Sequence, residues 1–287
     1  MLRKQLLKKI KSNWIKEFDK QLLIAERIEL KNALKYYKTE YKKSIDLFLQ
    51  NKTINGFNDL FLIRDFKRLY ENIYVNVGLR FAKWYAKNFR LFIKKDINIA
   101  KYDTIWLEKF QNIAQIVGAE RVTLVQGTAK ETLKKVYKKL MRDPEFMVLN
   151  ERVSGKILQS QFNKYSVSQA KRLIRTESTF AANFATHLSA SDIFDKNQLQ
   201  KEWITAMDER VRSSHANAHG QIVDFDKSFR VGGEFLTVPA DPSGSASNII
   251  NCRCQSAPFP KPDEYDASTN EFLSTVAISV ALTDDEN

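Results

Sequence analysis

The chain has 287 residues, 43% hydrophobic and 28% charged, and its 46 Lys and Arg against 34 Asp and Glu give a formal net charge of +12. This composition is typical of a folded soluble protein with a sizeable core and excludes a disordered chain. No stretch approaches the roughly 18 consecutive apolar residues of a membrane span. Residues 1–14 interleave charge with leucine instead of forming a signal peptide, so we expect a protein made and kept in a cytoplasm.

The charge is unevenly distributed along the chain. Residues 1–150 contain 32 Lys and Arg against 16 Asp and Glu, whereas residues 151–287 contain 14 against 18. Such an asymmetry indicates two regions with different partners, and the basic half suits nucleic acid or another acidic surface. The alternative is that these lysines only solvate the outer faces of long helices.

Long helices are predicted for the first half, because no proline occurs before Pro144 and Leu, Lys, Ile and Phe are abundant. Helices are expected over 2–49, 59–93, 104–117 and 128–141, with turn formers over 51–58. The first carries apolar residues at steps of four, a stripe suited to a helix–helix seam or, less well, a membrane surface: Leu2, Leu6, Ile10, Trp14, Phe18 and Leu22.

A further amphipathic helix begins near Ser166, and an acidic residue lies on its apolar stripe. Glu177 falls four residues after Leu173 and four before Ala181. A carboxylate in this place cannot stay charged and unpaired without a large cost, so we expect it to meet an arginine, a backbone donor or a metal. The alternative is a slight rotation of the helix that brings Glu177 to solvent.

Short strands are predicted after residue 201. They are expected over 203–207, 222–225, 229–231 and 234–238, with a hairpin turn at Gly232-Gly233. Asp208 is expected to cap a helix over 209–219 that Gly220 ends, and prolines 258, 260 and 262 are expected to end the folded part. The fold class is therefore α+β: a mainly helical N-terminal region followed by a small mixed domain with short antiparallel strands.

Two histidines and the two cysteines form a candidate metal site. His215 and His219 are spaced i, i+4 on the predicted helix, so both imidazoles can lie on one face. Cys252 and Cys254 are too close for a useful structural disulfide and are predicted to be thiols or metal ligands. The four suit one structural zinc ion. Otherwise the imidazoles pair with acids or backbone groups, and the thiols pack as small hydrophobic groups.

Motifs for catalysis are few. The segment over 215–219 lacks the glutamate that a zinc peptidase uses as general base, and the chain has no phosphate-binding glycine loop and no serine on a tight elbow. The remaining enzymatic alternative is a metal-dependent nuclease or hydrolase that uses Asp208, His215 and His219, because one metal with such ligands can activate water. We expect a binding protein rather than an enzyme.

An ordered set of short motifs resembles a known family. The motifs are Arg175-Thr176-Glu177, Trp203, Asp208-Glu209-Arg210-Val211-Arg212, Gly220, Pro239-Ala240-Asp241-Pro242 and Asn251-Cys252-Arg253-Cys254. In this order they resemble the phage Mu F-like minor head proteins, also called the phage head morphogenesis domain. Many relatives have cysteines near the position of His215.

The resemblance implies a minor head protein of a tailed bacteriophage, placed in the virion head near the portal and assembled in the host cytoplasm. It implies the portal protein and other head proteins as partners, a role in head morphogenesis and in DNA packaging or delivery, and no enzymatic activity. From their charge, the basic helices are expected to bind double-stranded DNA without sequence specificity. Neither a membrane nor a small-molecule substrate is expected, and no cofactor beyond the one candidate zinc ion.

Three regions are expected: a basic helical region over 1–117, the Mu F-like domain over 118–260 and an acidic, flexible tail over 261–287. Within the domain, bidentate arginine–carboxylate pairs are expected to hold short strands that bury little apolar area. The arginines are Arg175, Arg210, Arg212 and Arg253, and the carboxylates are Glu177, Asp208 and Asp241. A helical scaffolding or DNA-binding protein with an incidental C-terminal domain is the remaining alternative.

Overall fold

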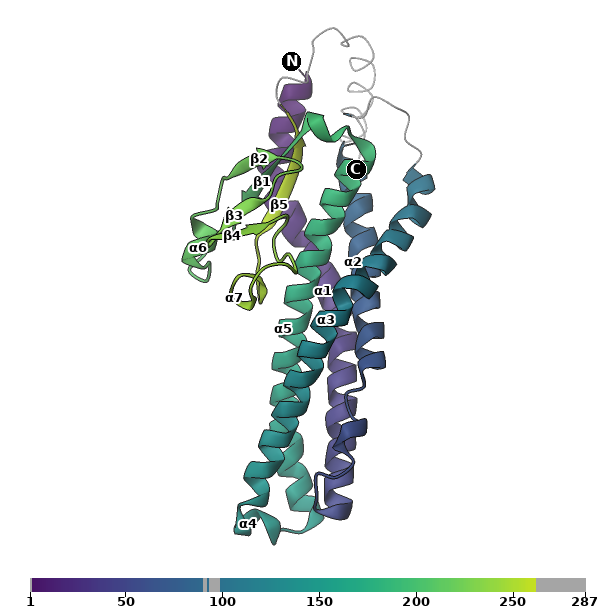
Figure 1. Ribbon diagram of the computed structural model, residues 1–287, viewed down its shortest axis with the longest axis vertical. Helices are drawn as coiled ribbons and strands as arrows, with labels where there is room; N and C mark the ends of the chain where they lie inside the picture. The colour runs from purple at the N-terminus through teal and green to yellow at the C-terminus, as the bar shows by residue number, and fades with distance from the viewer. Residues whose placement is uncertain (1, 90–91, 93–98, 262–287) are drawn as a thin grey trace, which may run out of the picture.

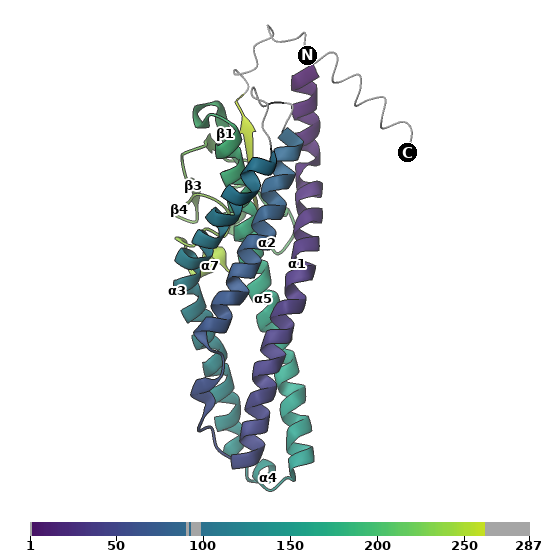
Figure 2. The ribbon, with the colours of Figure 1, turned by 90° about the vertical axis from the view of Figure 1, so that its right-hand side faces the viewer.

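The computed structural model describes residues 2–89, 92 and 99–261, and helices dominate it (Figure 1). The long helices form an elongated bundle and are α1 (Leu2–Asn51), α2 (Ile63–Phe89), α3 (Ile99–Met141) and α5 (Glu151–Ile193). The short α4 (Pro144–Met147) lies between α3 and α5, at the end of the bundle away from the N-terminus (Figure 2). At 1.5 Å per residue, α1 is about 75 Å long.

The bundle core is rich in aromatic side chains. Trp14 and Phe18 of α1 are buried, with ring centroids 4.9 Å apart for Trp14 and Trp84 of α2 and 4.7 Å apart for Phe18 and Phe81 of α2. From Trp14 to Leu22, the apolar stripe of α1 is therefore buried in a helix–helix seam. No helix among the described residues has an apolar stretch long enough to cross a membrane.

Fewer and longer helices form than the sequence predicted. The helices expected over 104–117 and 128–141 are both parts of α3, whereas the helix expected over 2–49 is α1. Gly118 and Gly127 both lie inside α3 without interrupting it. A Cβ added at Gly118 would meet the Tyr70 side chain at 3.8 Å, an ordinary contact distance, and Gly127 faces open space. The boundary expected between residues 117 and 118 falls inside this continuous helix.

The small domain contains two antiparallel sheets, and the α+β class is confirmed. In the larger sheet, β1 (Leu199–Ile204) pairs with β2 (Ile222–Asp224) on one side and β5 (Gln255–Pro260) on the other. The smaller sheet is the predicted hairpin of β3 (Phe229–Val231) and β4 (Glu234–Leu236), whose turn glycines have φ of 59° and 84°. The short helices α6 (Ser213–Ala216) and α7 (Ala246–Ile249) lie in the connections.

One prediction for this domain was wrong, because the helix expected over 209–219 forms only the four residues of α6. No strand was predicted at prolines 258 and 260, which belong to β5, the last described strand. This strand lies at the edge of the sheet, where fewer backbone donors are needed. The expected acidic tail lies outside the described residues from 262 onward.

The last strand ties the small domain to the bundle. The Tyr85 hydroxyl of α2 donates to the Pro258 carbonyl oxygen (3.0 Å), and the Gln255 side-chain amide donates to Asp19 of α1 (2.7 Å). As Figure 1 shows, the strands lie against one side of the bundle near its N-terminal end. The domain and the bundle therefore share one continuous core.

Candidate metal centre and cationic surfaces

A buried carboxylate joins three helices of the bundle to the small domain. Glu177 of α5 accepts hydrogen bonds from Arg121 Nη1 of α3 (2.7 Å) and from the hydroxyls of Tyr74 (2.9 Å) and Tyr70 (3.4 Å) of α2. A second nitrogen of Arg121 donates to the Ala240 carbonyl oxygen (3.1 Å). Burial raises the pKa of both tyrosines, which therefore stay protonated as donors. The predicted requirement of Glu177 for a partner is met by an arginine.

Arg253 and Asp208 form the expected arginine–carboxylate pair in the small domain. Both terminal guanidinium nitrogens of Arg253 donate to the carboxylate, with Nη2 2.6 Å from Oδ1. These hydrogen bonds lower the pKa of Asp208 to about 2. Asp208 also accepts the backbone N–H of Arg210 (3.1 Å). The pair joins the turn that follows β1 to the segment that contains both cysteines.

The expected pairing of Glu177 with an arginine of its own small domain was wrong. Arg175 binds Glu26 of α1 (2.8 Å), because residues two positions apart on a helix point to nearly opposite sides. Burial raises the pKa of Glu26 to about 7 even beside this guanidinium. The Arg175 pair therefore fastens α5 to α1 and leaves Glu177 to Arg121.

Asp241, Arg210 and Arg212 also do not form the expected pairs. The Asp241 carboxylate accepts backbone N–H groups of Thr237 (2.8 Å) and Ser243 (3.0 Å), so it shapes its own loop. Arg212 donates to the Ile250 carbonyl oxygen. Arg210 lies 3.8 Å from its neighbour Glu209 and is exposed. Asp241 and Arg210 are thus satisfied by groups close to them in the chain, and Arg212 is satisfied by a backbone carbonyl oxygen from the loop before Cys252.

A ladder of α5 side chains fixes the segment that contains both cysteines. Thr179 Oγ1 donates to the Cys252 carbonyl oxygen (2.8 Å), and Asn183 Nδ2 donates to the Cys254 carbonyl oxygen (3.1 Å). Asn183 Oδ1 accepts the backbone N–H of Ser256 (2.6 Å). All these groups are buried. These hydrogen bonds satisfy backbone groups just before and at the start of β5, on the side that faces α5 and has no neighbouring strand.

The other motif residues occupy structural positions around this segment. Thr176 Oγ1 accepts the backbone N–H of Asn251 (3.0 Å), and Asn251 has a φ of 57°. Gly220 has a φ of 76°, and its N–H donates to the carbonyl oxygen of the buried Trp203 (2.8 Å). Pro239 is buried at the start of the loop after β4. These residues position the chain and hold no reactive group.

Three of the four expected metal ligands come together. His215 Nδ1 lies 3.2 Å from Cys254 Sγ and 3.8 Å from Cys252 Sγ, and all three side chains are buried. His219 does not join them, because α6 ends at residue 216 and the i, i+4 spacing no longer places both imidazoles on one face. His219 Nδ1 instead accepts the backbone N–H of Thr205 (3.2 Å).

The residues of the nuclease alternative are not brought together. Arg253 occupies both oxygens of Asp208, and His219 points to the end of β1. In the part of the chain that the structure describes, the group of His, Cys, Asp and Glu able to hold a metal consists of His215, Cys252 and Cys254. A carboxylate positioned to activate a metal-bound water is therefore lacking among these described residues.

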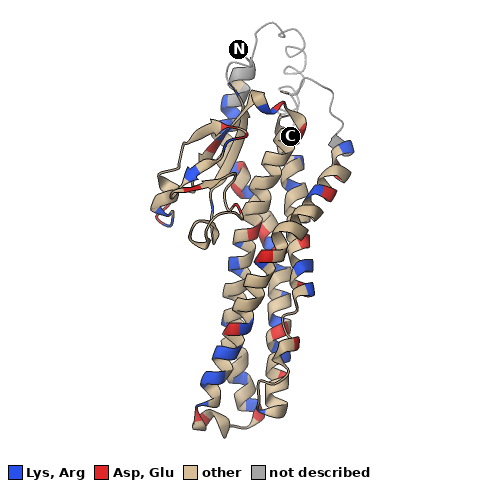
Figure 3. Cartoon of the chain, viewed as in Figure 1, with Lys and Arg blue, Asp and Glu red and all other residues tan. Residues whose placement is uncertain are grey.

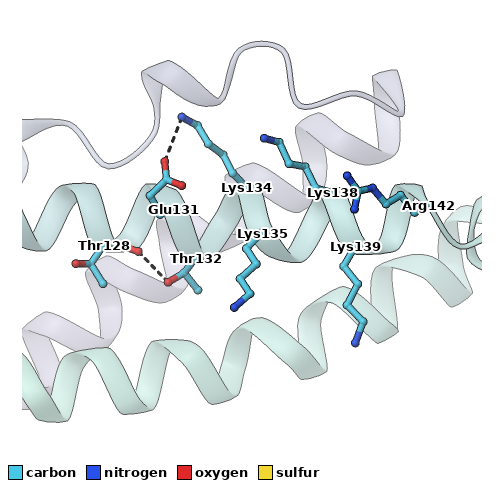
Figure 4. Close-up of a pocket in the computed structure, with 8 residues that line it drawn as sticks. All are labelled: Thr128, Glu131, Thr132, Lys134, Lys135, Lys138, Lys139 and Arg142. Atoms are coloured by element: carbon cyan, nitrogen blue, oxygen red, sulfur yellow. Dashed lines mark hydrogen bonds and ion pairs between the residues drawn. The ribbon is translucent and has the colours of Figure 1, made fainter.

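The C-terminal half of α3 presents a dense row of cations beside a shallow hollow of about 930 Å³, here called the basic groove (Figure 4). It is lined by Thr128, Glu131, Thr132, Lys134, Lys135, Lys138, Lys139 and Arg142. Figure 3 shows that this row continues toward the α4 end of the bundle. Glu131 is the one acidic residue in the lining, and it contacts Lys134 (3.6 Å). A row of this kind suits the phosphates of a nucleic acid.

A second cationic hollow, here called the arginine cleft, lies between α1, α5 and the small domain. Its volume is about 770 Å³, and its cationic lining consists of Arg27, Lys171, Arg172, Arg175, Arg210, Arg212 and Arg253. Four of these make no salt bridge to a described residue: Arg27, Lys171, Arg172 and Arg212, the last of which donates to the Ile250 carbonyl oxygen. The cleft can therefore accept an external anion without losing an internal ion pair.

Several residues of the site were not predicted from the sequence. Arg121 and the tyrosines that bind Glu177 lie on other helices, more than 50 residues away. Thr179 and Asn183 had a detectable signal, because with Thr176 they repeat at i, i+3 and i+7, which places polar groups on one face of a buried helix. Polar residues at such spacing in an apolar helix indicate an internal backbone partner.

Comparisons with known proteins agree with the motifs. The family model described as Phage Mu protein F like protein matches residues 115–257. The NAD(+)--arginine ADP-ribosyltransferase EFV of Enterococcus faecalis (strain ATCC 700802 / V583) is 27% identical over 117 residues, which cover 38% of this chain and 24% of that protein. This chain thus spans about a quarter of the length of that relative. No solved structure matches.

Proposed function

This chain belongs to the phage Mu protein F-like family, a family of phage head morphogenesis proteins, and we propose that it is a portal-associated minor head protein that contacts double-stranded DNA. The family match from α3 to β5 carries this proposal. On the same basis we place the protein in the virion head near the portal, assembled in the host cytoplasm, with other head proteins as partners and a part in DNA packaging or delivery.

We propose binding rather than catalysis, because the buried polar groups are already engaged with one another. Glu177 receives three donors, and Arg253 occupies both oxygens of Asp208. Carboxylates held in this way do not serve as general bases. The ADP-ribosyltransferase relative shares only 24% of its length with this chain, and its activity is not carried over.

Portal association is tested by co-expressing the full chain with the portal protein of the same phage. Size-exclusion chromatography with mass determination should show one complex of defined stoichiometry. A variant with Leu124→Lys and Ile116→Lys, two exposed apolar side chains of the family region, tests whether this face contributes. Separate elution of the two proteins at micromolar concentrations would argue against portal association.

DNA contact by the basic helices predicts a steep salt dependence, since each phosphate contact releases a counterion. Replacing Lys134, Lys135, Lys138 and Lys139 by Gln should lower the slope of log affinity against log salt by about one per lost contact. The matched control removes four exposed cations from the N-terminal part of α1, at the other end of the bundle: Lys8, Lys9, Lys16 and Lys20. Fluorescence anisotropy with a random-sequence duplex measures both slopes.

The two variants separate the outcomes of the DNA experiment. A larger loss in the basic-groove variant assigns the contact to α3, and an equal loss assigns it to the whole basic surface of the bundle. Retained affinity and slope in both variants, or no measurable affinity of the parent at low salt, would contradict DNA binding by the basic helices.

A further inference from the structure

The imidazole of His215 directs its polar contacts at two sulfur atoms. The three candidate ligand atoms, Nδ1 of His215 and Sγ of Cys252 and Cys254, all lie within 4.8 Å of one another. The other ring nitrogen, Nε2, is buried without a hydrogen-bond partner. The ring of Trp203 packs nearly perpendicular to the imidazole, with ring centroids 5.8 Å apart. A histidine and two thiols therefore converge on one point inside the domain.

The backbone around the thiols is fixed before any ligand arrives. Asn183 and Thr179 hold the carbonyl groups of both cysteines against α5. The backbone N–H of Cys254 also points at Cys252 Sγ (3.5 Å), an orientation that stabilises a metal-bound thiolate. Both cysteines are free of disulfides. A ligand set that is already positioned loses little conformational entropy when it binds a metal.

A small cavity adjoins the cluster. Its volume is about 20 Å³, room for one water molecule, and it is lined by His215 and Cys254 together with Arg210, Arg212 and Arg253. These arginines and Asn251 also line the arginine cleft, so the cavity lies next to that cleft. Cations at this place favour thiolate over thiol and compensate the negative charge of a dithiolate site.

We propose that His215 Nδ1, Cys252 Sγ and Cys254 Sγ bind one zinc ion, with a water molecule from the adjoining cavity as fourth ligand. Tetrahedral zinc with Zn–S of about 2.3 Å and Zn–N of about 2.0–2.1 Å separates sulfur from nitrogen by about 3.5 Å. The observed separations of 3.2 and 3.8 Å bracket this value. Each thiol releases its proton to solvent as its sulfur binds the ion.

This site differs from the set of four expected from the sequence, because His219 takes no part. It also does not depend on the proposed function, since it involves neither DNA nor the portal. Its effect is to join the α6 turn to the start of β5, two segments separated by more than 30 residues. An open fourth position beside the arginine cleft further leaves the ion accessible to a small anion.

The first experiment measures metal in the full chain after purification with zinc and dialysis. Mass spectrometry should find about one zinc per chain in the parent and in His219→Ala, and close to none in His215→Ala and in the Cys252→Ser/Cys254→Ser variant. Circular dichroism of each variant tells loss of metal from loss of fold. No metal in the parent, or metal retained by the folded double-cysteine variant, would overturn the site.

The second experiment uses cobalt in place of zinc and does not depend on the variants folding. Cobalt added to the chelator-treated parent should give the intense visible absorption of a tetrahedral thiolate site. Azide should change that spectrum, because it replaces the fourth ligand. Absence of the thiolate-to-cobalt band contradicts the site as a whole, and a spectrum insensitive to azide contradicts the open fourth position.

Discussion

At the scale of single residues, His187 is the side chain that most directly couples stability to pH. Its ring stacks on Phe225 with centroids 4.0 Å apart, and Nδ1 is buried without a partner. Burial, with help from Lys201 and Lys196, lowers the pKa of His187 to about 3. In the unfolded chain the imidazole titrates near its ordinary value of 6.5, so between pH 6.5 and 3 the unfolded state binds more protons and stability falls as the pH falls.

His187→Gln should remove this acid sensitivity. Between pH 7 and 5 the variant should lose about 2 kcal/mol less stability than the parent, measured by urea unfolding at both pH values. The prediction concerns the difference between the two proteins. Glu26, whose pKa burial raises to about 7, makes stability rise as the pH falls, and it does so equally in the parent and the variant. His219→Gln, which removes an exposed imidazole, is the control. Equal pH profiles for parent and His187→Gln would contradict the assignment.

At the scale of elements, the crossing of α2 and α3 requires a residue without a Cβ. A Cβ at Gly78 of α2 would lie 2.7 Å from the Phe110 ring of α3, in a position where the ring cannot withdraw. Gly78→Ala should therefore cost about 1–3 kcal/mol in the free energy of unfolding, although alanine favours helix. Gly127→Ala, in open space on α3, should gain up to about 1 kcal/mol. Chemical denaturation gives both values, and a stabilising Gly78→Ala would refute this view of the crossing.

The elements show why part of the fold could be predicted and part could not. The helices and the Gly232-Gly233 hairpin could be predicted, because they follow from the conformational preferences of residues that are neighbours in the sequence. β5 could not be predicted, because its prolines lack backbone N–H donors and argue against a strand. Its edge position reduces the need for such donors, and hydrogen bonds with Asn183 hold its first residues; both depend on the tertiary fold. The same limit applies to the site: the need of Glu177 for a partner was readable, but the identity of Arg121 depends on how α3 packs against α5.

At the scale of the whole molecule, the family region shares its core and its hydrogen bonds with the helices before it. Glu177 depends on hydroxyl donors from Tyr70 and Tyr74, and β5 is bound by Tyr85 and Asp19, all outside residues 115–257. Removing these helices would expose the shared core and leave a buried charge with fewer partners.

We therefore expect a fragment of residues 115–261 to lack a cooperative thermal transition. The control fragment, residues 1–261, retains every described residue of the bundle and the small domain and should melt like the full chain. Near-ultraviolet circular dichroism during heating distinguishes the two. A cooperative transition of the 115–261 fragment near the melting temperature of the control would show that the family region folds alone.

The hydrogen bond between Gln255 and Asp19 spans 236 residues and has a consequence in time. At about 5–20 residues per second of synthesis, α1 leaves the ribosome roughly 10–50 s before the strand that completes its contacts. During that interval the aromatic seam of α1 and α2 can associate, but Trp14 still lacks the Phe259 ring that packs against it at 5.3 Å. The nascent chain therefore stays incompletely folded during this interval. The rate of translation, and not the rate of helix formation, sets the time at which folding is completed.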